Sequence, residues 1–248
     1  MGKRKVKIAD IVIYLTVILM ALACLIPLMN MLAISFSNSA AATAGRVGII
    51  PVDFTTSSYA KLLKEEQYWR SLLISFERTV FGTLINVILV IFMSFPLSKS
   101  AREFRAQKVY MRLVLFAMLF NGGMIPTYLV VNKLHLCDTL WSLILPSAVG
   151  VGNIILFCAV GHWNDYFTGI LYISKIRNYP LQTYIQSVTA AFDISRVTDP
   201  KKIQEYLTIS EKTLNAAKIV VSTLPLMILY PFVIKYFKDG IVVGAVKE

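Results

Sequence analysis

A short polar interruption lies inside the most apolar region of the chain. Between residues 139 and 174, Asp165 is the single side chain with a formal charge. Ionisable groups at membrane depth are costly, and they usually face a cavity or a partner. We therefore expect Trp163, Asn164 and Asp165 to line a substrate pathway. The alternative interpretation is that Trp163, Tyr166 and Tyr172 belong to an interfacial aromatic belt.

A second candidate lies within the apolar segment 113–132. The sequence NGGMIPTY at residues 121–128 brings an amide, two glycines and a proline to the middle of that segment. Irregular backbone at this depth is tolerated only where protein or a water-filled cavity covers it, and transporters place such breaks beside their substrate path. Asn121 is therefore a fourth pathway candidate. The alternative is a continuous helix that is kinked at Pro126 and packed closely through its glycines.

Catalytic chemistry finds little support in the sequence. A phosphate-binding G-x-x-x-x-G-K-[ST] loop is absent, as are the H-E-x-x-H and G-x-S-x-G motifs. Residues 65–70 have the E-E-x-x-x-R spacing of one class of intramembrane metalloproteases, but His135 and His162 are placed in different segments. The three cysteines show no metal-type spacing, and we expect them to be reduced packing residues. We therefore expect no enzyme activity, no catalytic residue, no metal and no cofactor.

The composition indicates that lipid is the main solvent of this chain. Hydrophobic residues make up 56% of it and charged residues 16%, and the mean hydropathy is +0.65. A soluble domain usually carries ~25% charged residues. Five hydrophobic units span or nearly span a bilayer, at residues 11–44, 79–98, 113–132, 139–174 and 219–234, the last extended back through Leu214. The expected fold class is an all-α membrane protein, a multi-span helical bundle.

The distribution of charge predicts the orientation. Basic residues precede the first unit and dominate the link at residues 98–112, so both should be cytoplasmic. The first apolar unit is longer than the ~7–15 residues of a signal peptide's apolar region, so we expect an uncleaved anchor with a cytoplasmic N-terminus. The loop at residues 35–70 is then external, and the third unit exits near Lys133. The net charge of +11 reflects this bias, and we expect no nucleic-acid partner.

The number of crossings is ambiguous at residues 139–174. This run is too long for one crossing and too short for two crossings with a loop, since two would leave ~16–18 residues each. One crossing would place the polar segment 175–212 in the cytoplasm and the basic end of segment 213–248 outside. Two crossings would return that basic end to the cytoplasm, as its lysines favour. A segment that normally separates the two halves of the run is therefore expected to be missing.

Two stretches outside the hydrophobic units are amphipathic. The external loop has apolar residues at helical spacing between residues 59 and 73, as in a helix that lies on a membrane surface. A second set of residues also recurs at the helical period, namely Leu181, Tyr184, Ile185, Val188 and Phe192. We expect both to be short surface or docking helices within a single transmembrane domain, residues 1–248.

Several motifs together resemble one family over most of the chain. They are IPTYLVV at residues 125–131, LWSLILP at 140–146, WNDYF at 163–167, YPFVIKYF at 230–237 and PVDF at 51–54. This set resembles the carbohydrate-importer permeases of the ATP-binding-cassette (ABC) class, whose fold is called MetI-like. The NGGMIPTY version of the third segment is most similar to the subgroup associated with oligosaccharide and aldouronate-type uptake.

The resemblance implies a six-helix permease in the bacterial plasma membrane. It also implies a second permease as heterodimer partner, a cytoplasmic ATPase dimer and an extracytoplasmic solute-binding protein. Members of this family carry a cytoplasmic loop with a Glu-Ala-Ala signature between the fourth and fifth spans, and that loop docks into the ATPase. This chain has no Glu-Ala-Ala, and sequence like the fourth span joins sequence like the fifth at Leu156 and Phe157.

Three functional interpretations remain open at this point. The first is a permease that imports a sugar or oligosaccharide by alternating access, driven by a partner ATPase. The second is an internally deleted remnant that is uncoupled or inactive. The third is a membrane scaffold or sensor that does not transport and makes its contacts through segment 175–212.

Overall fold

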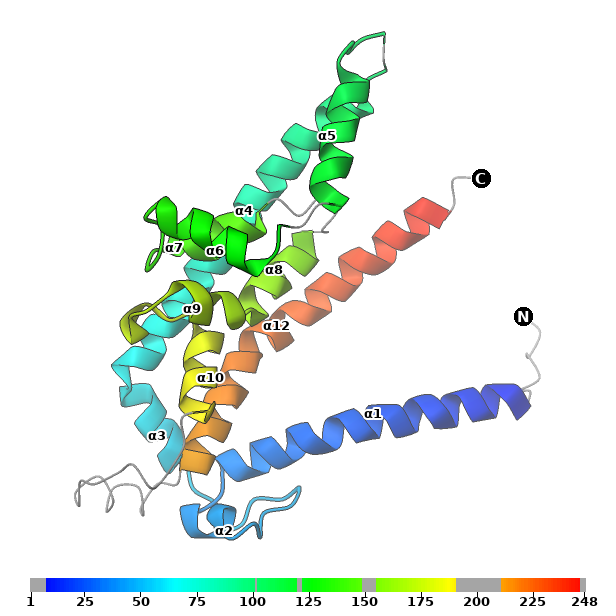
Figure 1. Cartoon of the computed structure of the whole chain (residues 1–248). Helices are drawn as coiled ribbons and strands as arrows, with labels where there is room; N and C mark the ends of the chain where they lie inside the picture. The colour runs from blue at the N-terminus through cyan, green and yellow to red at the C-terminus, as the bar shows by residue number, and fades with distance from the viewer. Residues whose placement is uncertain (1–7, 101, 120–121, 149–154, 191–210, 246–248) are drawn as a thin grey trace. The chain divides into compact units, whose positions relative to one another are not determined.

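The computed structural model describes residues 8–100, 102–119, 122–148, 155–190 and 211–245 (Figure 1). Within these ranges the regular structure is helical, and no strand occurs. The chain divides into two compact units, residues 1–64 with 193–221, and residues 65–192 with 222–248. Two of the described helices are long and apolar enough to cross a membrane, Asp10–Ser35 and Glu66–Ser98. The predicted all-helical fold class is confirmed.

In the first unit, the first predicted hydrophobic segment forms one long helix only as far as residue 35, and its last residues belong to the loop that follows. Helix α1 (Ile8–Ser35) has 28 residues, about 42 Å, which exceeds the ~30 Å of a bilayer's hydrocarbon core. The most apolar part of this helix contains no buried residue, whereas Ala33 and Ile34 at its end are buried. A helix that is apolar on every side and exposed over most of its length is suited to lipid contact.

The loop after α1 folds back onto the end of that helix. It contains α2 (Ser39–Thr43), which Asn38 caps by accepting from the Ala40 N–H at 2.9 Å, and α3 (Ser57–Lys64). From α3, the Tyr59 hydroxyl lies 2.8 Å from the Ser35 hydroxyl, and its ring lies 4.7 Å from that of Phe36. The predicted surface helix therefore ends at Lys64. The apolar residues that follow belong to the next helix.

Small side chains form the core of the first unit, and the beginning of α12 (Glu211–Ala245) contributes to it. The Lys212 ammonium donates to the Ala42 carbonyl oxygen at 3.0 Å, and Ala216 packs in the same cluster. The last predicted hydrophobic unit, extended back through Leu214, is therefore confirmed as part of one helix. Pro225 and Pro231 lie inside α12, and its residues from 222 onward belong to the second unit.

The second unit is organised along α4 (Glu66–Ser98), a helix of 33 residues. Hydropathy predicts a start at residue 79, because Glu77 and Arg78 precede the uncharged run. The helix starts earlier because polar residues at helical spacing, Ser71, Ser75 and Arg78, are buried against the rest of the unit. Because these buried residues are polar, hydropathy alone does not predict the first three turns and more of this helix.

The third predicted hydrophobic unit is broken into two helices. Helix α5 (Gln107–Leu119) and helix α6 (Met124–Lys133) are separated near Gly123, whose φ of +83° is a conformation that favours glycine. The Gly123 carbonyl oxygen accepts from the Thr127 hydroxyl at 2.8 Å. Pro126 lies in the first turn of α6, where its missing N–H costs nothing. The predicted irregular backbone is confirmed, and the continuous kinked helix is wrong.

The ambiguous run at residues 139–174 is also discontinuous. It forms α7 (Leu140–Ile144), the 3₁₀ helix η1 (Leu145–Ser147), α8 (Ile155–Asn164) and α9 (Phe167–Tyr172). Asp138, just before the run, joins its two ends: its N–H donates to the Tyr172 carbonyl at 3.0 Å, and its carboxylate accepts from the Ser174 N–H at 2.5 Å. The run therefore leaves and returns at one place, which is incompatible with a single crossing.

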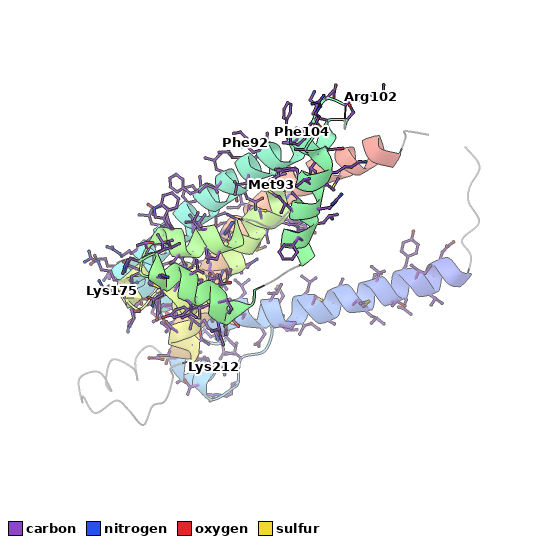
Figure 2. The ribbon with its side chains drawn as sticks, turned by 45° about the horizontal axis from the view of Figure 1, so that its top comes forward. Phe92, Met93, Arg102, Phe104, Lys175 and Lys212 are labelled. Carbon is purple, nitrogen blue, oxygen red and sulfur yellow. The ribbon has the colours of Figure 1, made fainter. Side chains whose placement is uncertain are left out.

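Contacts along α4 show how far this run extends. The Asn86 side-chain amide donates to the Ala148 carbonyl at 3.2 Å, and α8 packs along α4 on the way back. Beyond Asn86, α4 continues for about 18 Å to Ser98. Large apolar side chains are exposed on these last turns, namely Ile88, Ile91, Phe92 and Phe95. Figure 2 labels Phe92 on this part of the helix.

The polar segment after the run contributes the 3₁₀ helix η2 (Ile176–Asn178) and α10 (Leu181–Ala190). The predicted amphipathic stripe is confirmed over the described residues, since Leu181, Tyr184 and Ile185 are buried and α10 packs on α4 and α9. Its last member, Phe192, lies outside the described residues. The Tyr184 hydroxyl donates to the Glu65 carboxylate. Burial, with the help of this hydrogen bond, raises the pKa of Tyr184 well above its ordinary value, so the phenol stays a donor at neutral pH.

Candidate substrate pathway

The predicted residue Asp165 lies at the junction between α8 and α9, where it is paired with a buried arginine of α4. The Arg78 side chain is completely buried, and its Nη2 lies 2.5 Å from Asp165 Oδ2. The same guanidinium donates to the Asp165 carbonyl oxygen at 2.7 Å and to the Thr168 hydroxyl at 2.6 Å. The other carboxylate oxygen, Asp165 Oδ1, accepts from the Thr168 N–H at 3.1 Å. The Asp165 carboxylate therefore links α4, the junction between α8 and α9, and the first turn of α9.

Arg78 was not among the residues singled out from the sequence. A charge in a membrane helix is retained only where it is paired and hydrogen-bonded, and Arg78 meets both conditions through Asp165. In the sequence, Arg78 stands out only as a lone arginine directly before the uncharged part of a span. An arginine at such a position can also extend its side chain outward so that the charge reaches the headgroup layer. That alternative fails here because the side chain is buried instead of reaching outward.

The neighbours of Asp165 in the WNDYF motif differ in their exposure to solvent. Trp163 is 7% exposed, and its indole Nε1 has no hydrogen-bond partner among the described residues. Asn164 is exposed. A buried Trp163 does not fit an interfacial belt, whereas Tyr166, which is 45% exposed, fits one. The fourth candidate, Asn121, lies outside the described residues.

A glycine allows the two central helices of the second unit to approach closely. At Gly82 of α4, a side-chain Cβ would come within 2.6 Å of the His162 Nε2 atom of α8. His162 is itself buried, so its ring has little room to move away. The missing side chain at Gly82 thus lets the His162 ring of α8 pack directly on α4, close in sequence to the Arg78 and Asp165 pair.

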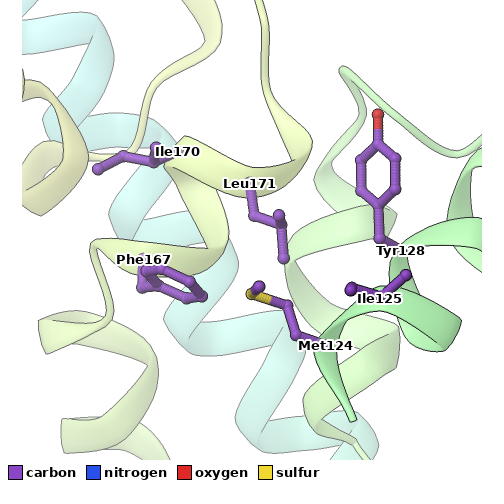
Figure 3. Close-up of a pocket in the computed structure, with 6 residues that line it drawn as sticks. All are labelled: Met124, Ile125, Tyr128, Phe167, Ile170 and Leu171. Atoms are coloured by element: carbon purple, nitrogen blue, oxygen red, sulfur yellow. The ribbon is translucent and has the colours of Figure 1, made fainter.

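A pocket of about 350 Å³ lies between the broken third segment and α9 (Figure 3). Its lining consists of six residues: Met124, Ile125, Tyr128, Phe167, Ile170 and Leu171. The Tyr128 ring is stacked on that of Tyr172, with centroids 6.2 Å apart. Pockets with mostly apolar walls and a few polar groups are typical of small-molecule sites.

This pocket brings together the two regions that the sequence singled out. Met124 directly follows the break at Gly123, and Phe167 follows Asp165 closely in the chain. The wall-forming side chains are neighbours of the predicted candidates in the sequence. Apolar residues next to a polar interruption gave no signal of their own, because they look like any other lipid-facing residue of a span.

Comparisons with known proteins match almost the whole chain, although no family model matches it. It is 30% identical to the polygalacturonan/rhamnogalacturonan transport system permease protein YtcP of Bacillus subtilis strain 168, over 98% of this chain and 99% of YtcP. It is 32% identical to the protein LplC of the same organism, over 90% of this chain and 89% of LplC. A solved structure, the crystal structure of a bacterial ABC transporter involved in the import of the acidic polysaccharide alginate, matches with a TM-score of 0.78 and 26% identity. The match covers 96% of this chain and 99% of the solved chain.

The lengths of these matches differ from the length of the chain in a consistent way. The match to YtcP extends over 287 positions, but 98% of this chain is only about 243 residues. The match to LplC extends over 267 positions, against about 223 residues of this chain. In both alignments about 44 positions therefore have no residue from this chain.

The relatives named by function are transport permeases and not enzymes. Their similarity extends over nearly all of each protein, so it concerns the whole transmembrane domain. The described helices agree with it, since two of them are long and apolar enough to cross a membrane and the fold matches that of the solved importer chain. The chain therefore belongs to the family of transmembrane permease subunits of carbohydrate ABC importers.

Proposed function

We propose that this chain forms part of the translocation path for oligosaccharides that carry uronic acid residues. The observation that carries the proposal is the nearly full-length match to YtcP, which is named for polygalacturonan and rhamnogalacturonan transport. The matching solved structure belongs to a transporter of alginate, also an acidic polysaccharide. In this proposal the chain pairs with a second permease, a cytoplasmic ATPase dimer and an extracytoplasmic binding protein, and it works by alternating access.

The predicted pathway residues remain proposals, and the pocket between α6 and α9 refines them. Trp163 and Asn164 adjoin this pocket in sequence, and Asn121 precedes the break from which its α6 wall begins. In our proposal, Asp165 acts by holding α8 and α9 in place through Arg78 rather than by contacting sugar. The apolar and aromatic wall around Tyr128 offers the surface on which a sugar ring packs.

A second candidate function is that of an uncoupled permease, and a specific observation favours it. About 44 positions of both relatives are missing from this chain, and the sequence predicts a missing segment between residues 156 and 157. The run at residues 139–174 returns at Asp138, and the exposed end of α4 continues beyond Ala148. We propose that the missing segment is the ATPase-docking loop, together with the adjoining ends of the fourth and fifth spans.

The proposed orientation places segment 175–212 outside and both chain ends in the cytoplasm. Figure 2 shows Arg102 of the basic link and Lys175 at opposite ends of the second unit. The positive-inside rule assigns the Arg102 end to the cytoplasm. An external segment 175–212 also lets the basic end of α12 return inside.

Cysteine labelling will test this orientation. In a variant without the three natural cysteines, we expect Lys175→Cys to react with a membrane-impermeant maleimide in intact cells, because it lies at the external end. Arg102→Cys should react only after permeabilisation. Lys247→Cys should behave like Arg102→Cys. Labelling of Lys175→Cys and Arg102→Cys from the same side would contradict the orientation.

Co-purification will distinguish the functional candidates. The tagged chain, extracted in mild detergent with its genomic neighbours expressed, should retain the second permease, because the helices that form the bundle are present. Recovery of ATPase and binding protein as well supports the coupled importer. Recovery of the second permease alone supports the uncoupled form, and recovery of neither partner contradicts both.

A further inference from the structure

A second pocket in the second unit is lined by charged residues and lies away from the aromatic one. It has a volume of about 380 Å³, and its lining is Glu66, Gln67 and Arg70 of α4 with Arg177 of η2. The Gln67 side-chain amide donates to the Ile176 carbonyl at 2.8 Å, and Arg70 Nε donates to the Arg177 carbonyl at 2.9 Å. Two side chains of α4 thus hold the backbone of η2 in place, so that Arg177 lines the same pocket as Arg70.

The charges of this pocket are unbalanced. Two arginines face one carboxylate, and among the described residues no ion pair joins Glu66 to either arginine. Arg70 uses Nε to hold the loop, so its two terminal nitrogens stay available as donors. Two like charges held in one pocket repel each other, and an anion between them removes that repulsion.

The chemistry of these groups selects a carboxylate as ligand. Guanidinium groups bind carboxylates through paired N–H donors, and the resulting bonds are stronger than those between neutral groups. Glu66 and Gln67 provide acceptors for hydroxyl groups beside the charge, as a sugar ring offers.

We propose that the Arg70 and Arg177 pocket binds the carboxylate of a uronic acid residue at the mouth of the transport path. This inference rests on the proposed function for the choice of a sugar acid, and on the pocket for the site. The pocket lies at the start of α4, next to the external loop in the proposed orientation. It is a contact for incoming sugar, separate from the aromatic pocket between α6 and α9.

Binding of a defined acidic disaccharide to the full chain in lipid nanodiscs tests the site. Digalacturonate and its carboxyl-reduced neutral counterpart are compared by equilibrium dialysis. We expect Arg70→Gln and Arg177→Gln each to weaken digalacturonate binding about tenfold or more, and to leave the neutral sugar unaffected. Arg177→Lys keeps the charge but loses the paired donors, so its loss should be intermediate. Arg102→Gln, an exposed arginine at the other end of the unit, is the matched control.

Each other outcome of this experiment has a definite meaning. Equal affinity of the native chain for the acidic and neutral sugars overturns the proposal, as does no binding of digalacturonate or unchanged affinity in both glutamine variants. Loss of binding-protein docking in these variants, with digalacturonate binding intact, makes the pocket a protein contact and also overturns it. Native digalacturonate binding that is lost in the variants, without transport by any complex, refutes the proposed function and leaves the site standing.

Discussion

For the uncoupled form proposed above, we expect ATP hydrolysis by the partner ATPase to stay at its basal rate when binding protein and sugar are added to vesicles that contain this chain. The physical reason is that alternating access needs a contact through which the ATPase and the permease drive each other. We propose that this contact is carried by the roughly 44 positions that the two relatives have and this chain lacks. The measurement is phosphate release with and without substrate-loaded binding protein.

A graft provides the matched control for this experiment. The segment that YtcP has and this chain lacks is inserted between Leu156 and Phe157, and the grafted chain is reconstituted in the same way. We expect substrate-dependent ATP hydrolysis to return in the graft, because the α8 side of the insertion already packs along α4. Stimulated hydrolysis by the unaltered chain would show that its coupling to the ATPase does not require the missing segment.

Replacing Arg78 by methionine will strongly destabilise the second unit. Removing one partner of a buried ion pair typically costs 3–5 kcal/mol, because the remaining charge is left without compensation. The loss should lie near the lower end of this range, because the Asp165 side chain is 27% exposed. Arg78 is completely buried, and all its hydrogen bonds to Asp165 and Thr168 are lost in this variant. Asp165→Leu should also be severely destabilising, because it strands the buried guanidinium. The measurement is unfolding by a denaturing detergent in mixed micelles.

The double variant distinguishes a charge effect from a packing effect. Arg78→Met combined with Asp165→Leu leaves no unpaired charge, so we expect it to be more stable than either single variant. Arg102→Met, in the exposed link between α4 and α5, should change stability by less than about 0.5 kcal/mol. If the double variant lost the sum of the two single losses, the pair would contribute only through separate contacts.

Long apolar stretches made most of the helical segments predictable from sequence. The first span and the last helix follow from apolar length, and the break near Gly123 follows from adjacent glycines and a proline. The start of α4 did not follow, because its first turns are held by buried polar side chains such as Ser75, whose hydroxyl accepts from the Leu181 N–H. Such a contact depends on a residue more than a hundred positions away, so no local pattern reveals it.

Only part of the candidate site could be predicted from the sequence, for the same reason. A polar interruption in an apolar run identified Asp165, but its partner Arg78 lies on another helix and resembles an ordinary flanking charge in sequence. The sequence likewise did not show that the chain returns to residue 138 at the end of residues 139–174. This return depends on Asp138, a single short side chain outside the run that bonds to the backbone of Ser174 and Lys175.

The bonds of Asp138 make residues 139–174 a hairpin that is closed at its base. Asp138 bonds to Tyr172, Ser174 and Lys175 at this base, and η2 and α10 follow the base directly in the chain. In our proposal, residues are missing from the distal end of the hairpin while the bonds at its base remain. The length of the hairpin and the architecture at its base would then vary independently. On that proposal, a permease of this construction loses its link to an energy source without losing the fold around the base.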